Sequence, residues 1–125
     1  MILADSTVWI DLFRGRSLEM QRLLKHEKIV MHPFVAAELA LGSLKDRRKT
    51  LAHLDRLPQV QVADLGEVRS LIEAHALYSK GIGLTDAHLI ASCLITPGTQ
   101  LWTRDVRLAA VAQTLRIHAH LPRLN

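Results

Sequence analysis

Short apolar runs that alternate with helical segments are the feature that most constrains the fold of this chain. Each run is too short for a helix and long enough for a strand. Such an alternation predicts an α/β fold in which helices cover both faces of a parallel sheet and the crossovers are right-handed. Five strands are expected, at residues 2–4, 28–32, 60–63, 100–103 and 117–119.

Capping residues and prolines predict where the helices begin and end. Pro33 suits the first turn of a helix, and Gly42 suits a helix end. Asp64 and Glu67 have the spacing of a capping box, and Thr85 is expected to cap a later helix. Because no linker or repeat interrupts the 125 residues, we expect a single domain over 1–125. Helices are expected over residues 6–13, 18–25, 33–41, 44–57, 65–79, 86–95 and 105–115.

Composition narrows the classes of function. With 49% hydrophobic and 22% charged residues, the chain is typical of a soluble globular protein. Only 4% of residues are aromatic, which argues against base stacking as the main mode of nucleic-acid binding. The formal charge of +4 fits a polyanionic partner only weakly.

Cysteine usage and hydropathy favour the cytoplasm. Cys93 is the only cysteine, which excludes an internal disulfide and any multi-cysteine zinc site, and a buried inert thiol is expected there. The apolar residues at the amino terminus are interrupted by Asp5 and Asp11 and lack a basic flank, unlike a signal peptide. No apolar run approaches the roughly 18 residues of a membrane span, so no membrane association is expected.

Three aspartates occupy equivalent places at the start of predicted helices. Asp5 and Asp105 follow strands directly, and Asp86 opens a helix after a glycine-containing turn. The carboxyl ends of parallel strands meet at one edge of a sheet, where such folds bind ligands. A structural role is the alternative for each, because Asp is a good N-cap and is favoured by the helix dipole. Asp64 illustrates that alternative, since it has its own capping-box partner.

Glu38 is harder to explain as a structural residue. Its segment is otherwise apolar, and at helical spacing it shares a face with Phe34 and Leu41. A charged carboxylate on a core-facing stripe is costly unless it is paired or bound to a metal. The alternative is a Glu at the edge of the stripe whose carboxylate reaches solvent.

An acidic cluster suits metal-dependent phosphodiester hydrolysis. Carboxylate oxygens are preferred ligands of hard cations such as Mg²⁺ and Mn²⁺. A bound divalent ion activates water and stabilises charge on phosphoryl and leaving oxygens, so the reaction needs no nucleophilic side chain. We therefore expect Asp5 to anchor a metal site that cuts a phosphodiester.

The sequence motifs around the four acids resemble those of the PIN-domain ribonucleases, and more narrowly those of VapC-type toxins from bacterial or archaeal toxin–antitoxin pairs. They occur in the family's order over nearly the whole chain. The matching motifs are LADSTVWI (3–10), AAEL (36–39), LTDAHLIA (84–91) and LWTRD (101–105).

This resemblance implies a three-layer α/β/α sandwich with a central five-stranded parallel sheet. It implies an Mg²⁺- or Mn²⁺-dependent endoribonuclease, the toxic component of a type II toxin–antitoxin system. It also implies a homodimer and a VapB-type antitoxin protein that covers the site. The resemblance assigns the catalytic and metal-binding roles to Asp5, Glu38, Asp86 and Asp105, with Ser6 and Thr103 as supporting hydroxyls.

One departure from the family concerns a second metal ion. Many PIN domains carry a further acid a few residues after the Thr-x-Asp motif, which is residues 103–105 here. Residues 106–109 of this chain contain no such acid. One ion, or a second held mainly by substrate phosphate, is therefore expected.

Basic residues and histidines give weaker patterns. Arg104 and Arg107 flank Asp105 and are candidates for holding substrate. The basic run over 45–49 would contact RNA phosphates or form a solvated helix face. His118 and His120 alternate on the last predicted strand, but they lack a third zinc ligand nearby.

Two alternative functions remain open from the sequence. A receiver-like signalling domain has a similar length and a phosphorylated Asp, and Asp64 follows a strand as that role requires. Against it, Ala4 and Ser6 flank Asp5 where an adjacent acid is needed. The other alternative is a catalytically inactive PIN-like module that binds RNA or protein.

Overall fold

Three short parallel strands form the centre of the fold. The computed structural model describes residues 1–121, so 122–125 of the predicted domain lie outside the described residues. In it, β1 (Ile2–Ala4) lies between β2 (Ile29–Val30) and β3 (Gln100–Trp102). The α/β class and the parallel sheet predicted from the sequence are confirmed.

The prediction of five strands is wrong for the two outer ones. Residues near 60–63 contact the sheet through one bridge, between Met31 and Gln59, and those near 117–119 through another, between Leu101 and His118. At each of these two bridges the sheet residue makes two backbone hydrogen bonds to the neighbouring segment. Those of Met31 are 2.8 and 3.0 Å long. Arg116 and His120 have positive φ angles of 60° and 52°, which turn the chain out of the strand direction on either side of 117–119.

The helices begin and end close to the predicted residues, with three exceptions. The fourth helix starts only after Asp46, whose φ of 49° is left-handed, and the fifth ends before Ala76, whose φ is 50°. The sixth is capped by Gly83 and not by Thr85. The helices are α1 (Ser6–Phe13), α2 (Leu18–Lys25), α3 (Pro33–Ala40), α4 (Arg47–Arg56), α5 (Leu65–Ala74), α6 (Leu84–Ile95) and α7 (Val106–Thr114).

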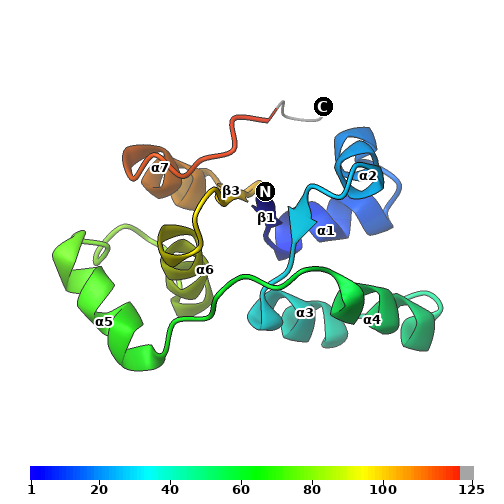
Figure 1. The fold of residues 1–125 in the computed structure, drawn as a ribbon, viewed down its shortest axis with the longest axis horizontal. Coiled ribbons are helices and arrows are strands. Elements are labelled where there is room, and N and C mark those ends of the chain that lie inside the picture. Colours follow the sequence, from blue (N-terminus) through cyan, green and yellow to red (C-terminus); the bar gives the residue numbers. More distant parts are fainter. Residues whose placement is uncertain (122–125) are drawn as a thin grey trace.

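The helices gather in two groups around the strands. Figure 1 shows α1 to α4 on one side of β1 and α5 to α7 on the other. Within the groups α1 packs on α2 and α3, α3 packs on α4, and α5 packs on α6. The strands lie inside, with Leu3 and Leu101 fully buried. Burying an aliphatic side chain of this size contributes roughly 1.5–3 kcal/mol, so these strands anchor the core despite their length.

Two further expectations can be compared with the structure. No helix within residues 1–121 is long and apolar enough to cross a membrane. Cys93 is buried, and burial raises the pKa of its thiol to about 12, which confirms the expected inert thiol.

Candidate functional site

Asp5 lies where β1 ends and α1 begins, and its side chain is only 4% exposed. Its Oδ1 atom accepts hydrogen bonds from the amides of Thr7 (3.0 Å) and Val8 (3.3 Å), and from the Thr7 hydroxyl. Its Oδ2 atom accepts from the Thr103 hydroxyl. Asp5 is therefore the N-cap of α1, as expected, and Oδ2 keeps a lone pair for a further partner.

Two threonine hydroxyls hold the loop between β3 and α7 against Asp5. The Thr103 hydroxyl donates to Asp5 and accepts from the amide of Asp105 at 3.0 Å. The Thr7 hydroxyl also donates to Asp5, and it accepts from the amide of Arg104 at 2.9 Å. Two of these bonds, from Thr103 to Asp5 and from Arg104 to Thr7, join residues almost a hundred positions apart and so tie the β3–α7 loop to the start of α1.

Glu38 lies on an exposed face of α3. The prediction that this face points to the core is wrong, because Phe34 is 37% exposed and Leu41 is 90% exposed, whereas α3 buries Val35 and Leu39. The alternative of a solvent-reaching Glu is therefore correct for its helix face. The carboxylate nevertheless lies near enough to Ser6, the first residue of α1, for the Ser6 hydroxyl to lower its pKa, which brings it to the Asp5 end of that helix.

Asp86 completes a group of three acids that repel one another. It lies in the first turn of α6, where its Oδ2 accepts from the Gly83 amide at 3.1 Å. Burial and then the charge of Asp86 raise the pKa of Asp5 above its usual value, against the lowering effect of its hydrogen bonds. Burial, Asp86 and Asp5 likewise raise the pKa of Glu38, against the hydrogen bond from Ser6. The structure thus brings together Asp5, Glu38 and Asp86.

Asp105 lies at the margin of this group. It is exposed and caps α7, with Oδ1 accepting from the amides of Arg107 (2.8 Å) and Leu108 (3.1 Å). Its connection to Asp5 runs through Thr103, which binds both residues. Asp105 is not among the groups that shift the pKa of Asp5 or Glu38, so the structure places it less tightly than the other three acids.

The donor chemistry of the site fits a divalent hard cation. Within residues 1–121 no three His, Cys, Asp or Glu side chains are arranged to hold a metal ion. The Asp5, Glu38 and Asp86 carboxylates supply hard oxygens, and a cation would offset the burial and the repulsion that together raise the pKa of the first two. Metal binding would require Glu38 and Asp86 to turn their carboxylates toward Asp5.

Comparison with known proteins decides the family. A model of the PIN domain matches residues 2–113. The chain belongs to the PIN domain family. It is 41% identical over 110 residues to Ribonuclease VapC32 of Mycobacterium tuberculosis, an alignment that covers 88% of this chain and 89% of that protein. It is 27% identical over 130 residues to VapC ribonuclease Mb1587 of Mycobacterium bovis. That alignment covers 95% of this chain and 97% of that protein. The resemblance to VapC-type PIN domains is therefore confirmed.

The two candidate arginines of this PIN domain lie in different surroundings. The Arg104 guanidinium pairs with Asp11 of α1 at 3.2 Å. Arg107 lies against Gly81, where a Cβ atom would meet its Cδ and Nη1 atoms at 2.7 Å. Arg104 is thus tied to α1, whereas Arg107 lies against the connection between α5 and α6.

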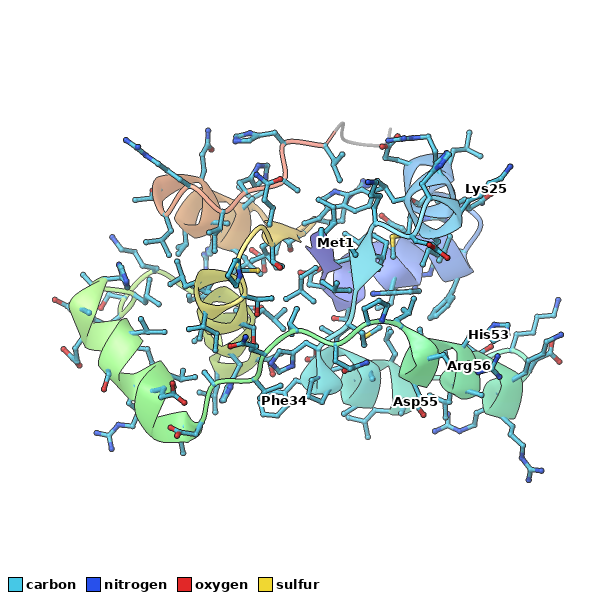
Figure 2. All side chains as sticks on the ribbon, viewed as in Figure 1. Met1, Lys25, Phe34, His53, Asp55 and Arg56 are labelled. Carbon is cyan, nitrogen blue, oxygen red and sulfur yellow. The ribbon has the colours of Figure 1, made fainter. Side chains whose placement is uncertain are left out.

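Other polar residues have structural contacts in this PIN domain. Arg47, from the basic run, donates to the carbonyl oxygens of Ala40 and Gly42 at the end of α3. His88 is buried and packs against Phe34, with ring centroids 4.5 Å apart. Figure 2 shows Phe34 at the end of α3 nearest α6. His118 and His120 approach to 3.3 Å between their Nδ1 atoms, and the described residues provide no third metal ligand for them.

Sequence reasoning missed the roles of Thr7 and Asp11. Both lie in the first helix, where a hydroxyl or a carboxylate has many ordinary uses. Thr7 follows Asp5 by two residues, which is the spacing at which a first-turn hydroxyl can reach its cap residue. No comparable sequence pattern indicates the ion pair between Asp11 and Arg104, because the two lie on different elements.

A pocket opens beside the acids in this PIN domain. Its volume is about 660 Å³, and Ser6 and Glu38 form part of its wall. Apolar side chains of α1, including Ile10 and Phe13, form another part, and Arg14, Lys45 and Asp46 contribute charges of both signs. The acidic site is therefore continuous with a surface that has both apolar and charged side chains.

Proposed function

We propose that this PIN domain is a metal-dependent endoribonuclease that hydrolyses RNA phosphodiester bonds. The observation that carries the proposal is the convergence of Asp5, Glu38 and Asp86, from three separate elements, into one mutually repelling group. Two relatives bear ribonuclease names, which supports the activity. In the proposed site these three acids and Asp105 hold Mg²⁺ or Mn²⁺.

The chain's own residues would orient the reaction. The Thr7 and Thr103 hydroxyls would orient Asp5, and the Ser6 hydroxyl would act on Glu38 close to it. When bound, the divalent ion supplies an activated water and neutralises charge on the phosphate oxygens. Asp105, which is exposed and whose amide is bonded to the Thr103 hydroxyl, would turn its carboxylate toward the substrate.

A single metal ion is the proposed stoichiometry. No acid follows Asp105 within residues 106–109, and Arg107 is present instead. The site therefore has four carboxylates at most, one of them at the margin, which favours one ion with substrate phosphate completing its coordination.

We further propose a toxin role with a VapB-type antitoxin as protein partner, a homodimer, and a cytoplasmic location for the single domain. Support for a protein partner comes from the pocket beside Glu38, whose wall combines exposed Ile10 and Phe13 with Arg14 and Lys45. A partner segment seated there would cover the access to Glu38 and Ser6, and so inhibit the enzyme.

The experiment is an RNA cleavage assay with purified protein. We expect cutting with Mg²⁺ or Mn²⁺, no cutting in EDTA, and no cutting by Asp5→Ala protein that keeps its circular dichroism spectrum. Cutting by the Asp5→Ala protein in EDTA at the wild-type rate would refute the proposal. Metal-independent RNA binding without any cleavage would support the inactive PIN-like module instead.

The receiver-like alternative receives no support from the surroundings of Asp64. Its Oδ1 accepts from the Glu67 amide at 2.7 Å, and the Glu67 side chain returns a bond to the Asp64 amide at 3.1 Å. This complete capping box accounts for Asp64 as a structural residue.

A further inference from the structure

We infer that the groove between α7 and the connection from α5 to α6 binds one nucleotide of the RNA strand next to the phosphate that is cut. The inference rests on the proposed function and adds to it a subsite outside the acidic group. Figure 1 shows this connection passing beside α7. The groove has a volume of about 320 Å³.

The groove has an apolar floor. Ala110 and Val111 form this floor from α7, and Arg107 and Thr114 line the groove from the same helix face, at the i, i+3, i+4, i+7 spacing. Leu77, from the connection, faces them across the groove. A nucleobase presents a flat, largely apolar surface, and a floor of this kind can cover it without contributing a buried charge.

The rim of the groove is positively charged. Lys80 and Arg107 line it, and Arg107 lies in the first turn of α7. None of its lining residues, all between positions 75 and 115, is an Asp or a Glu. Since the guanidinium fork of arginine binds phosphate with two hydrogen bonds, and lysine adds a point charge, this rim matches the phosphate on either side of a base.

The groove begins beside the acids. Arg107 is two residues after Asp105 and binds the Asp105 carboxylate through its amide. Arg107 also lies against Gly81, and Gly83 of the same connection donates to Asp86. From Arg107 to Thr114 the helix rises about 10 Å, at 1.5 Å per residue. An RNA strand with one phosphate at the acids can therefore continue along α7 with its next nucleotide in the groove.

Charge variants test the rim. The probe is a fluorescently labelled single-stranded RNA, titrated with full-length Asp5→Asn protein, which binds without cutting. Adding Lys80→Gln and Arg107→Gln should weaken binding at least fivefold. It should also reduce the slope of log affinity against log salt by about 0.7 for each phosphate that is no longer neutralised. Arg69→Gln is the matched control, because Arg69 is exposed on α5 and does not line the groove.

A steric variant tests the floor. Ala110→Phe fills the groove without changing charge, so it should weaken binding of the same RNA while leaving the salt slope unchanged. Wild-type affinity in both the charge and the steric variants would overturn the inference, and so would an equal loss in the Arg69→Gln control. Cleavage by the otherwise wild-type protein is measured separately. If the groove variants bind RNA with wild-type affinity and the otherwise wild-type protein still cuts RNA, the groove is not a nucleotide subsite. The proposed function would then be unaffected.

Discussion

Asp5 has two roles that substitution separates. Its carboxylate caps α1, and it interacts electrostatically with Glu38 and Asp86. We predict that Asp5→Asn keeps the stability of the wild type within about 1 kcal/mol, because Asn is an equally good cap, and abolishes RNA cleavage. Asp5→Ala should also abolish cleavage, and should lose about 0.5–2 kcal/mol of unfolding free energy. Urea unfolding and a cleavage assay measure the two effects, and equal stability of the two variants would contradict the capping role.

Thr103 is predicted to act through Asp5. Thr103→Val keeps the shape but leaves a buried Asp5 oxygen and the Asp105 amide without their hydroxyl partner. We expect a loss of about 1–3 kcal/mol in stability and a 10–100-fold fall in cleavage or metal affinity. Thr103→Ser retains the hydroxyl and should recover most of both. A Val variant with the cleavage rate of the Ser variant would show that the hydroxyl does not position the acid.

At the scale of the element, α3 begins on a histidine that has to stay neutral. The Nδ1 atom of His32 accepts from the Phe34 amide at 2.9 Å, and the ring is fully buried. Burial, and then the nearby His88, lower the pKa of His32 from 6.5 to about 4. Between those values the unfolded chain binds more protons than the folded one, so stability should fall as the pH drops through this window.

The size of this effect is on the order of 3 kcal/mol, from the conversion of pKa shift to free energy. His32→Asn keeps a capping side chain but cannot titrate, so the fall in its stability between pH 6.5 and 4 should be smaller by that amount. Urea unfolding at several pH values measures the difference. Parallel pH profiles for the two proteins would contradict the neutral cap.

Helices were predictable where a cap or a proline marks them, as at Asp64 and Pro33. The end of α5 was not, because Ala76 adopts a left-handed φ of 50°, a conformation that an alanine side chain does not favour and that the sequence therefore does not indicate. The buried face of α3 was not predictable either. Its residues are apolar on nearly every side, so the spacing of Glu38 could not decide between core and solvent.

At the scale of the whole molecule, the parallel sheet explains how acids far apart in sequence can meet. The central β1 delivers Asp5, and its neighbour β3 delivers the loop with Thr103 and Asp105 to the same edge. The sequence motifs predicted which acids form the site, and the structure brings Asp5, Glu38 and Asp86 together. The marginal position of Asp105 and the pairing of Arg104 with Asp11 depend on side-chain contacts between elements, which sequence spacing does not encode.

The most direct test of the central claim is a Mn²⁺ titration of the purified protein followed by electron paramagnetic resonance. We predict one ion bound per chain, lost in Asp5→Asn and retained in Asp64→Asn. Asp64 is the matched control, since it is also an N-cap aspartate but has Glu67 as its capping-box partner. Equal Mn²⁺ binding by Asp5→Asn and wild-type protein, or equal loss in both variants, would contradict a metal site built on Asp5.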